Sequence, residues 1–297
     1  MMFSVILPTC DRTGDLARCL DRLAPGFQTF EATQYEVIVS DDGRDRESRQ
    51  MVGERFPWVV WLQGPRRGPA ANRNHGAAAA KGEWLVFVDD DCLPEPGWLE
   101  GYARAISGFP GVHVFEGKTV AGSPRSRLDE EAPVNTTGGL LWSCNICHNR
   151  EVFHRLGGFC EKFPHPCLED IEWRYRLGNA GETTVFVENA VVLHPWRRFA
   201  KTFRAYLKMR VVSYRILVSL WPVHHKRFFP RLRMLFRLAR AYFGGLLQFR
   251  GRGFCAGSRK FAVEFFLVGI VQPVMGCAMG RNRAEKKMKS KADGLLP

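Results

Sequence analysis

The chain has 297 residues, 45% of them apolar and 25% charged, enough to bury a full core in one large domain or two smaller ones. Its formal charge of +13 is uneven, because residues 199–297 carry 21 Lys and Arg against 3 Asp and Glu, while residues 1–198 carry 22 against 27. This composition excludes a largely disordered chain, and nine cysteines without a regular spacing favour reduced thiols in a cytoplasmic protein. We expect an ordinary soluble domain over 1–198 and a region that meets an anionic surface over 199–297.

Short apolar runs alternate with helical patterns along the first half of the chain. The predicted strands are 3–8, 35–39, 58–62 and 84–88, and the predicted helices are 13–23, 68–80 and 96–106. Continuous apolar strands are typical of a parallel sheet with both faces covered by helices. Beyond Gly117 the pattern is less regular, with helices expected at 151–156 and 168–179 and strands within 183–193. The predicted fold class is α/β, a Rossmann-like, mostly parallel sheet with helices on both faces.

The last third of the chain has another pattern. Apolar residues from Phe228 to Leu246 recur at helical spacing with arginines largely opposite, which predicts a basic amphipathic helix in a membrane interface. Residues 261–280 contain one charge and one proline, so both a membrane span and an interfacial or re-entrant segment stay open. The lysine-rich segment 281–291 suits an anionic cytoplasmic leaflet. We expect 199–297 to be a separate, basic amphipathic helical region that associates with a membrane.

Polar clusters follow three of the four predicted strands, and ligands of such sheets bind beyond the carboxyl ends of the strands. The clusters are Thr9–Arg12, Ser40–Gly43 and Asp89–Asp91. Three adjacent carboxylates repel one another unless a cation lies among them. Carboxylate oxygens select Mg²⁺ or Mn²⁺, which also accept phosphate oxygens as ligands. Asp89–Asp91 therefore predict a site for a divalent cation and the phosphate oxygens of a ligand, with an ordinary polar strand end or an acidic helix N-terminus as the alternative.

The remaining motifs each allow two interpretations. Asp41-Asp42-Gly43 could contact a nucleobase or ribose, or could form an ordinary turn. Arg73 could pair with a phosphate or with a local aspartate. Glu169 and Asp170 begin a predicted helix, where carboxylates either complement the helix dipole or supply a general base.

As an ordered set, these motifs carry a resemblance that none of them carries alone. The set is Phe3-Ser-Val-Ile-Leu-Pro-Thr9, Val39-Ser-Asp-Asp-Gly43, Asn72-Arg-Asn74, Phe87-Val-Asp-Asp-Asp91, Gly157-Gly-Phe159 and Glu169-Asp170. It resembles glycosyltransferase family 2 over roughly residues 1–198. The resemblance implies the GT-A fold, an inverting mechanism and a nucleotide-sugar donor.

The resemblance also implies roles for single residues. Asp170 matches the catalytic base, and Asp91 the metal ligand, with Asp89 and His194 as further metal candidates. The metal would be Mg²⁺ or Mn²⁺, and a packed strand-end histidine is the alternative for His194. The implied nucleotide-sugar-binding residues are Pro8, Thr9, Asp11, Asp42, Arg73, Asp89 and Asp90. The implied acceptor residues are Trp142, Asn145, Glu169 and Trp173, with a core role as the alternative for either tryptophan.

We predict an enzyme that adds one sugar to a hydroxyl acceptor, because the Gln/Arg-x-x-Arg-Trp signature of processive members is not apparent after His194. The acceptor is expected to be lipid-linked or membrane-associated, as in glycan, lipopolysaccharide or exopolysaccharide assembly. The enzyme would lie on the cytoplasmic face of the membrane, as a peripheral or monotopic protein, without a nucleic-acid partner.

Two other functions stay open. A nucleotidyltransferase would need a glycine-rich basic loop, for which Thr9–Gly14 is a poor candidate, and a non-catalytic protein could bind membrane or nucleic acid through its basic tail. A zinc site at Cys144-x-x-Cys147 lacks a second ligand pair of the usual spacing.

Overall fold

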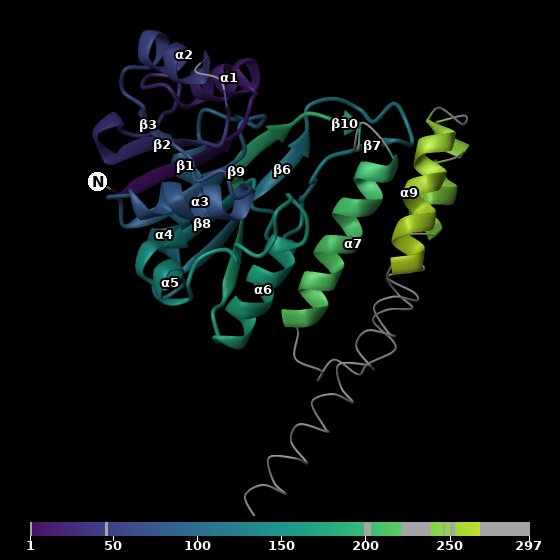
Figure 1. Cartoon of the computed structure of the whole chain (residues 1–297). Helices are drawn as coiled ribbons and strands as arrows, with labels where there is room; N and C mark the ends of the chain where they lie inside the picture. The colour runs from purple at the N-terminus through teal and green to yellow at the C-terminus, as the bar shows by residue number, and fades with distance from the viewer. Residues whose placement is uncertain are drawn as a thin grey trace, which may run out of the picture. The chain divides into compact units, whose positions relative to one another are not determined.

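Strands and helices alternate along the N-terminal half of the chain as the sequence predicts (Figure 1). The computed structural model describes residues 2–44, 47–198, 203–220, 239–245, 247–249 and 253–267. The chain divides into two units, the first made of residues 1–124 and 132–197 and the second of 125–131 and 198–297. The boundary predicted at residue 198 lies one residue from this division, and the segment 125–131 joins the second unit.

The first unit is built on an eight-stranded sheet with the order β3-β2-β1-β4-β8-β6-β9-β5. The strands are β1 (Phe3–Thr9), β2 (Tyr35–Asp41), β3 (Val60–Gln63), β4 (Trp84–Val88), β5 (Leu93–Pro94), β6 (Val114–Ala121), β8 (Asn145–Asn149) and β9 (Thr184–His194). β1 lies parallel to β2 and β4, and β2 lies parallel to β3. The carboxyl ends of these four strands therefore meet at one edge, which confirms the predicted parallel sheet.

The other half of the sheet is mixed. β8 pairs antiparallel with both β4 and β6, whereas β6 pairs parallel with β9. The short β5 pairs antiparallel with β9 through Leu93 and Leu193. This pairing brings the end of β9 next to the chain that follows β4, so His194 lies close to the acidic strand end.

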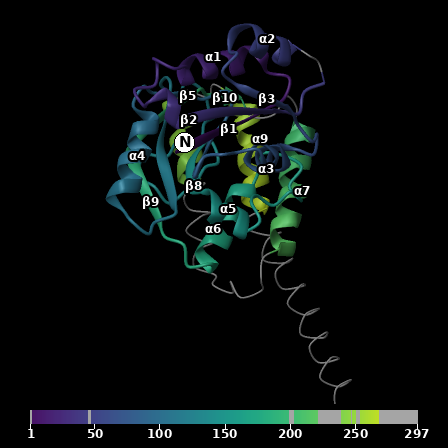
Figure 2. The same ribbon diagram turned by 90° about the vertical axis from the view of Figure 1, so that its left-hand side faces the viewer.

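Helices cover both faces of the sheet. They are α1 (Thr13–Leu23), the 3-10 helix η1 (Ala32–Gln34), α2 (Glu47–Arg55), α3 (Pro69–Ala78), α4 (Trp98–Gly108), α5 (Arg150–Arg155) and α6 (Glu169–Asn179). Successive side chains of a strand point to opposite faces. In β1, Leu7 accordingly joins a core cluster with Leu16 of α1, and Ile6 joins another with Ala77 of α3. Figure 2 shows α1 and α2 on the opposite side of β1 and β2 from α5 and α6.

The second unit contains β7 (Glu130–Glu131), α7 (Phe203–Leu220) and α9 (Phe254–Phe266), and β10 (Arg197–Arg198) lies at the boundary between the units. Glu264 of α9 is buried and joins the two helices. It accepts a hydrogen bond from the Tyr206 hydroxyl at 2.5 Å and pairs with Arg210 at 2.5 Å. Lys260 of α9 pairs with Glu131. These polar contacts hold α7, α9 and the segment 125–131 in one unit.

Much of the predicted membrane-associating region lies outside the described residues. Of the predicted helix from Phe228 to Leu246 the structure describes 239–245, and of the stretch 261–280 it describes 261–267. The segment 281–291 is also outside. In the described part of the chain, no helix combines the length and the apolar character that crossing a bilayer requires.

Candidate active site at the carboxyl ends of the strands

The predicted acidic cluster follows β4, whose five residues are all buried. Asp90 is completely buried, Asp91 is 7% exposed and Asp89 is partly buried. Carboxylates removed from water in this way require cations or strong hydrogen bonds. Each of the three has such partners, and the partners differ from one aspartate to the next.

Asp90 is held by the loop that follows β1. Its Oδ2 accepts a hydrogen bond from the Thr9 hydroxyl at 2.6 Å, and its Oδ1 lies 2.6 Å from Nη2 of Arg12. Burial raises the pKa of Asp90 to about 7, although Arg12 and the Thr9 hydrogen bond favour the ionised form. Thr9 therefore lies at the acidic strand end, and its predicted contact with the donor stays a prediction. Arg12, which sequence reasoning did not select, is its closest cation.

Asp89 is joined to the start of α6 by Arg73 of α3. Nη2 of Arg73 lies 2.6 Å from Asp89, and Nη1 lies 3.3 Å from Glu169. The Arg73 side chain is only 3% exposed. Burial is the largest single influence and opposes ionisation of Asp89, but Arg73, together with His194 and Arg12, outweighs it and lowers the pKa of this carboxyl group. Of the two interpretations of Arg73, the structure shows the pairing with a local aspartate, so its predicted contact with the nucleotide stays a prediction.

Asp170 follows Glu169 in the first turn of α6, after Leu168 in the left-handed conformation at φ = 72°. Its Oδ1 accepts a hydrogen bond from the N–H of Ile171 at 2.8 Å. Burial raises the pKa of Asp170 to about 6, although that hydrogen bond and Arg73 favour the ionised form. A carboxyl group with a pKa near neutrality can accept a proton at working pH and release it afterwards, which is what a general base requires.

Asp91, Cys92 and His194 form the only group of three potential metal ligands within the described ranges. Nε2 of His194 lies 3.5 Å from Oδ2 of Asp91. Nδ1 of His194 lies 2.8 Å from the Pro195 carbonyl and is assigned as the donor there, so Nε2 is left with its lone pair. Asp91 and His194 thus fit a divalent cation.

The other members of the acidic region fit a metal less well. Burial raises the pKa of the Cys92 thiol, and a protonated thiol is a poor ligand for Mg²⁺ or Mn²⁺. Asp89, which was predicted as a second ligand, is engaged by Arg73 instead.

The predicted nucleoside contacts lie at the ends of β1 and β2. Pro8 and Thr9 of β1 pair with Ser40 and Asp41 of β2. Asp41 is buried and closes a turn, since it accepts hydrogen bonds from the Gly43 N–H at 2.7 Å and from the Ser48 hydroxyl. The structure therefore supports the turn interpretation for the first aspartate of this motif.

Two further predicted nucleoside residues lie at the same edge. Asp42 accepts a hydrogen bond from the N–H of Arg66 at 2.7 Å. Asp11, with φ = 52°, is exposed and accepts one from the N–H of Arg44 at 3.0 Å. Asn72 of α3 fixes this region because its amide donates to the carbonyls of Thr9, at 3.1 Å, and Ser40, at 2.9 Å.

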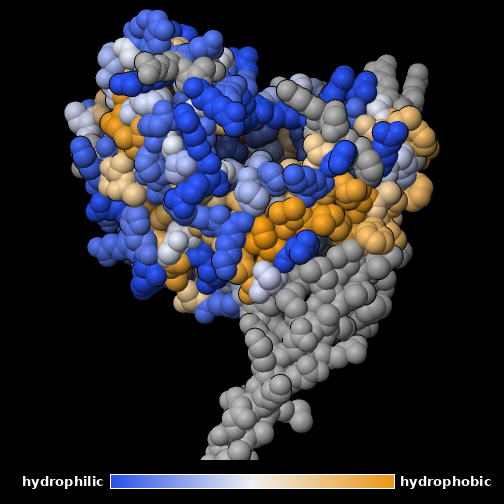
Figure 3. All heavy atoms as spheres, in the orientation of Figure 1, coloured by the Kyte–Doolittle hydropathy of each residue, from blue (hydrophilic) through white to orange (hydrophobic). Residues whose placement is uncertain are grey.

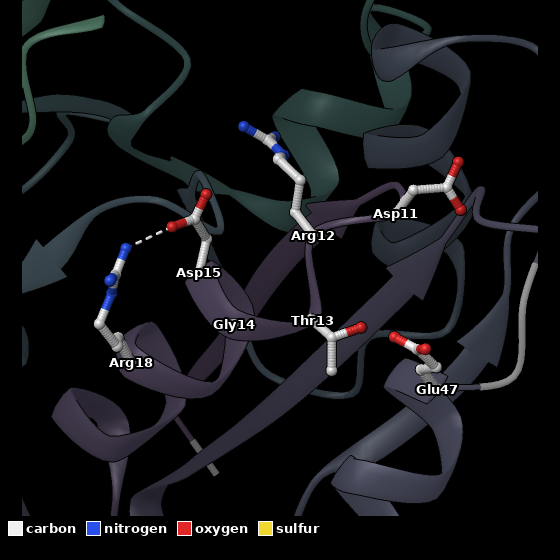
Figure 4. A pocket seen from close by; sticks show the side chains of 7 residues that line it. All are labelled: Asp11, Arg12, Thr13, Gly14, Asp15, Arg18 and Glu47. Atoms are coloured by element: carbon white, nitrogen blue, oxygen red, sulfur yellow. Dashed lines mark hydrogen bonds and ion pairs between the residues drawn. The ribbon is translucent and has the colours of Figure 1, made fainter.

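A pocket of about 430 Å³ opens beside Asp11 at the start of α1 (Figure 4). It is lined by Asp11, Arg12, Thr13, Gly14, Asp15, Arg18 and Glu47. Asp15 and Arg18 form an ion pair in this pocket, as the dashed line in the figure shows. The pocket thus combines acidic and basic side chains next to the predicted nucleotide site.

The four predicted acceptor residues are mostly buried. Asn145 is 2% exposed, and its amide donates to the carbonyls of Lys118 and Ala190 while its oxygen accepts from Trp98 and Tyr102. An amide whose hydrogen bonds are all made to buried groups of the sheet and of α4 has none left for an acceptor, which corrects the prediction for Asn145.

Trp173 is also in the core. It is fully buried, and its Nε1 donates to Nε2 of His148 at 3.1 Å. Burial lowers the pKa of His148 to about 3, so this ring is neutral and accepts that hydrogen bond. The core role is therefore the one that the structure supports for Trp173. Glu169 is buried against Arg73, and Trp142 is partly buried.

The site contains a second arginine that sequence reasoning missed. Nε of Arg197 lies 2.5 Å from Oδ2 of Asp91, and its Nη2 lies 2.9 Å from Asp15. Arg12 could have been predicted as a site residue from its place in the polar cluster after β1. Arg197 could have been predicted from the basic pair Arg197-Arg198, which begins three residues after His194.

Comparison with known proteins agrees with this geometry. Residues 4–136 match the family model described as Glycosyl transferase family 2. The chain is 25% identical over 218 residues to "Glycosyltransferase AglE" of Haloferax volcanii, and the aligned region covers 68% of this chain and 69% of that protein. It is 32% identical over 211 residues to "Pre-mycofactocin glycosyltransferase" of Mycobacterium tuberculosis, which covers 65% of this chain and 43% of that protein. The chain spans less than two thirds of the length of several such relatives.

Solved structures of glycosyltransferases have the same fold. S. aureus TarS 1–349 in complex with UDP aligns with a TM-score of 0.52 and 20% identity, covering 90% of this chain and 89% of that one. The mannosyltransferase PcManGT from Pyrobaculum calidifontis, in complex with GDP-Man and Mn²⁺, aligns with a TM-score of 0.53 and 18% identity, covering 99% and 79%. These similarities confirm the predicted GT-A fold.

Proposed function

Because this chain belongs to glycosyltransferase family 2, we propose that it transfers a single sugar from a nucleotide-sugar donor to a hydroxyl acceptor, with inversion at the anomeric carbon. One observation carries the proposal. Arg73 pairs with Asp89 after β4 and with Glu169 beside Asp170, which ties the predicted base to the predicted diphosphate site. Relatives of the same fold have been solved with UDP, with UDP-GlcNAc and with GDP-Man, which supports a nucleotide-sugar donor.

Asp170 is assigned the role of general base. Its carboxylate would remove the proton of the acceptor hydroxyl as that oxygen attacks the anomeric carbon. Glu169, held by Arg73, and the N–H of Ile171 fix the first turn of α6 around it. Because the attacking oxygen and the departing nucleotide lie on opposite faces of the sugar, the product has the inverted configuration.

Asp91 and His194 are assigned to a divalent cation, Mg²⁺ or Mn²⁺. Such an ion would supply Lewis-acid stabilisation of the charge that develops on the leaving diphosphate. Thr9 and Arg12 hold Asp90 in place behind this carboxylate. Pro8, Thr9, Asp11 and Asp42 are assigned to the nucleoside end of the donor.

A screen of nucleotide sugars tests the donor assignment. We expect one donor to bind in a Mn²⁺-dependent manner and to undergo slow hydrolysis that releases a nucleoside diphosphate, and Asp91→Asn to lose both. Release of pyrophosphate would identify a nucleotidyltransferase. Asp21→Asn is a matched control because Asp21 is an exposed carboxylate paired with Arg55 on the surface, and it should behave like the wild type.

The acceptor is proposed to be lipid-linked or membrane-associated, with the enzyme on the cytoplasmic face of a membrane. Residues 199–297 carry 21 basic against 3 acidic residues, which suits anionic lipid. In the second unit, Phe254, Phe265 and Phe266 of α9 are 50%, 41% and 52% exposed. Figure 3 shows apolar side chains gathered over α7 and α9. Exposed aromatic side chains beside basic residues are typical of proteins that bind a membrane interface.

Flotation of the full chain with vesicles tests this part. We expect binding to vesicles that contain phosphatidylglycerol, weaker binding to pure phosphatidylcholine, and a loss of binding in Phe254→Ser/Phe265→Ser/Phe266→Ser. Binding that is equal on both lipids and unchanged in the triple variant would contradict the proposal. Retention on RNA or DNA in place of vesicles would favour a nucleic-acid partner.

A further inference from the structure

Three nitrogen atoms converge on one oxygen of Asp91. Nε of Arg197 lies 2.5 Å from Oδ2, Nε2 of His194 lies 3.5 Å from it, and Nη1 of Arg12 lies 3.8 Å from it. Asp91 is 7% exposed, so few directions of approach to this carboxylate remain. Oδ2 of Asp91 is the oxygen that would bind a metal together with His194. This oxygen is already paired with Arg197.

A divalent cation and the Arg197 guanidinium would compete for this oxygen. Both are positively charged and both would stand within a few ångströms of Oδ2, so their mutual repulsion disfavours simultaneous binding. Arg12 is different, because its closer partner is the fully buried Asp90 at 2.6 Å. If Arg12 left, that carboxylate would remain buried without its nearest cation, which is costly.

Arg197 can leave without a similar penalty. Its second partner, Asp15, also pairs with Arg18, so Asp15 keeps a cation when Arg197 departs. Asp91 would receive the metal in exchange. The Arg197 side chain is 36% exposed and can reach solvent or a bound anion. No carboxylate is left unpaired by the exchange.

We propose that Arg197 is a counter-ion of Asp91 that a divalent cation displaces, and that the diphosphate of the donor favours the exchange by binding the released guanidinium. This inference rests on the proposed function, because it takes the metal and the diphosphate from it. Metal binding to the free protein is then weakened by Arg197, and metal and nucleotide diphosphate strengthen each other's binding. By linkage, the same factor describes both effects.

Titration of Mn²⁺ into the full chain, followed by the electron paramagnetic resonance of free Mn²⁺, tests the proposal. UDP and GDP serve as diphosphate probes. In the wild type we expect one of them to tighten Mn²⁺ binding by about 5–150-fold, the usual range of coupling between sites. Arg197→Gln should bind Mn²⁺ alone about tenfold more tightly than the wild type, and its coupling to the nucleotide should shrink.

A second variant guards against a folding defect in the first. Asp15→Asn removes the other anchor of Arg197 and leaves Asp91 untouched, so it should also tighten the binding of Mn²⁺ alone. Arg55→Gln, which breaks an exposed pair with Asp21, is the matched control and should bind Mn²⁺ like the wild type. Far-ultraviolet circular dichroism checks the fold of each variant.

The outcomes separate the two proposals. Mn²⁺ binding that is unchanged or weaker in both Arg197→Gln and Asp15→Asn, while the wild type still binds Mn²⁺ together with a nucleotide, overturns the exchange and leaves the proposed function standing. Failure of every variant to bind Mn²⁺, with and without UDP or GDP, overturns the exchange together with the metal part of the proposed function.

Discussion

Two groups of carboxylates at this edge of the sheet differ in their partners. After β4, each aspartate has its own arginine: Arg73 for Asp89, Arg12 for Asp90 and Arg197 for Asp91. At the start of α6, Glu169 shares Arg73 with Asp89, but Asp170 forms no ion pair with any residue that the structure describes, and its pKa is raised to about 6, mainly by burial. Arg73 keeps the pKa of Asp89 low, whereas burial raises the pKa of Asp90 to about 7 in spite of Arg12. Protonation of Asp90 would leave Arg12 without its nearest carboxylate, and protonation of Asp170 breaks no ion pair, so Asp170 is better suited to exchange a proton with a substrate.

The largest expected effect comes from removing the proton acceptor. Asp170→Asn keeps the size and polarity of the side chain but cannot accept the proton of the acceptor hydroxyl. We expect sugar transfer to fall by about 10²–10⁴-fold, the usual contribution of a general base. The affinity for the donor, measured by calorimetry in the presence of Mn²⁺, should stay close to that of the wild type.

Glu172→Gln provides a comparison within the same helix turn, because Glu172 is paired with Arg176. A moderate effect there with a large one at Asp170 would support the assignment. If Asp170→Asn kept nearly full turnover, another residue would be the base. The absence of an ion pair at Asp170 would then have no role in catalysis.

The parallel half of the fold and its acidic edge could be predicted because their signals are local. β1, β2 and β4 are continuous apolar runs, and each ends directly in polar residues. Since parallel neighbours place their carboxyl ends together, the order of the runs sufficed to bring Thr9, Asp41 and Asp89–Asp91 to one edge.

The other half depends on contacts between distant segments. β8 is short and reads Asn145-Ile-Cys-His-Asn149, and it becomes a strand by pairing with β4 and β6 on either side. Asn145 looked like a ligand-binding residue because nothing local shows that two carbonyls of the sheet and two side chains of α4 satisfy its amide. Arg197 reaches Asp91 because β9 runs beside β5, a pairing of segments about a hundred residues apart.

A change at the arginine shared by both groups has the next largest expected effect. Arg73→Gln leaves Asp89 and the buried Glu169 without their common cation. Removing one partner of a buried ion pair usually costs about 3–5 kcal/mol of folding free energy. Urea denaturation at pH 8, where carboxylates are ionised, measures this loss.

Arg73→Lys keeps the charge but not the planar fork that reaches two carboxylates, so we expect an intermediate loss. Arg104→Gln, which breaks a surface pair with Glu100, is the control and should cost at most about 1 kcal/mol. If Arg73→Gln and Arg104→Gln lost the same free energy of unfolding, the ion pairs of Arg73 with Asp89 and Glu169 would not stabilise the fold.

The smallest expected effect is in the pH dependence, and it separates Asp170 from its neighbours. The ionised form of Asp170 is the active one, so kcat/KM should rise with pH, reach half its maximum near pH 6 and level off above it. The effect on stability has the opposite sign. A raised pKa means that the folded protein holds this proton more tightly than the unfolded chain, so this contribution is present at low pH and is lost as pH rises from about 4 to 6.

Asp170→Asn should therefore lose the rise of kcat/KM near pH 6, and it should unfold at higher urea than the wild type at pH 8, because the penalty for a buried charge is gone. Residual activity of this variant measured from pH 5 to 9 provides the decisive comparison. A rise near pH 7 that persists in Asp170→Asn would point to Asp90, whose pKa is raised to about 7 by burial. In that case Asp90, after β4, would be the group that exchanges the proton, and Asp170 would not be the base.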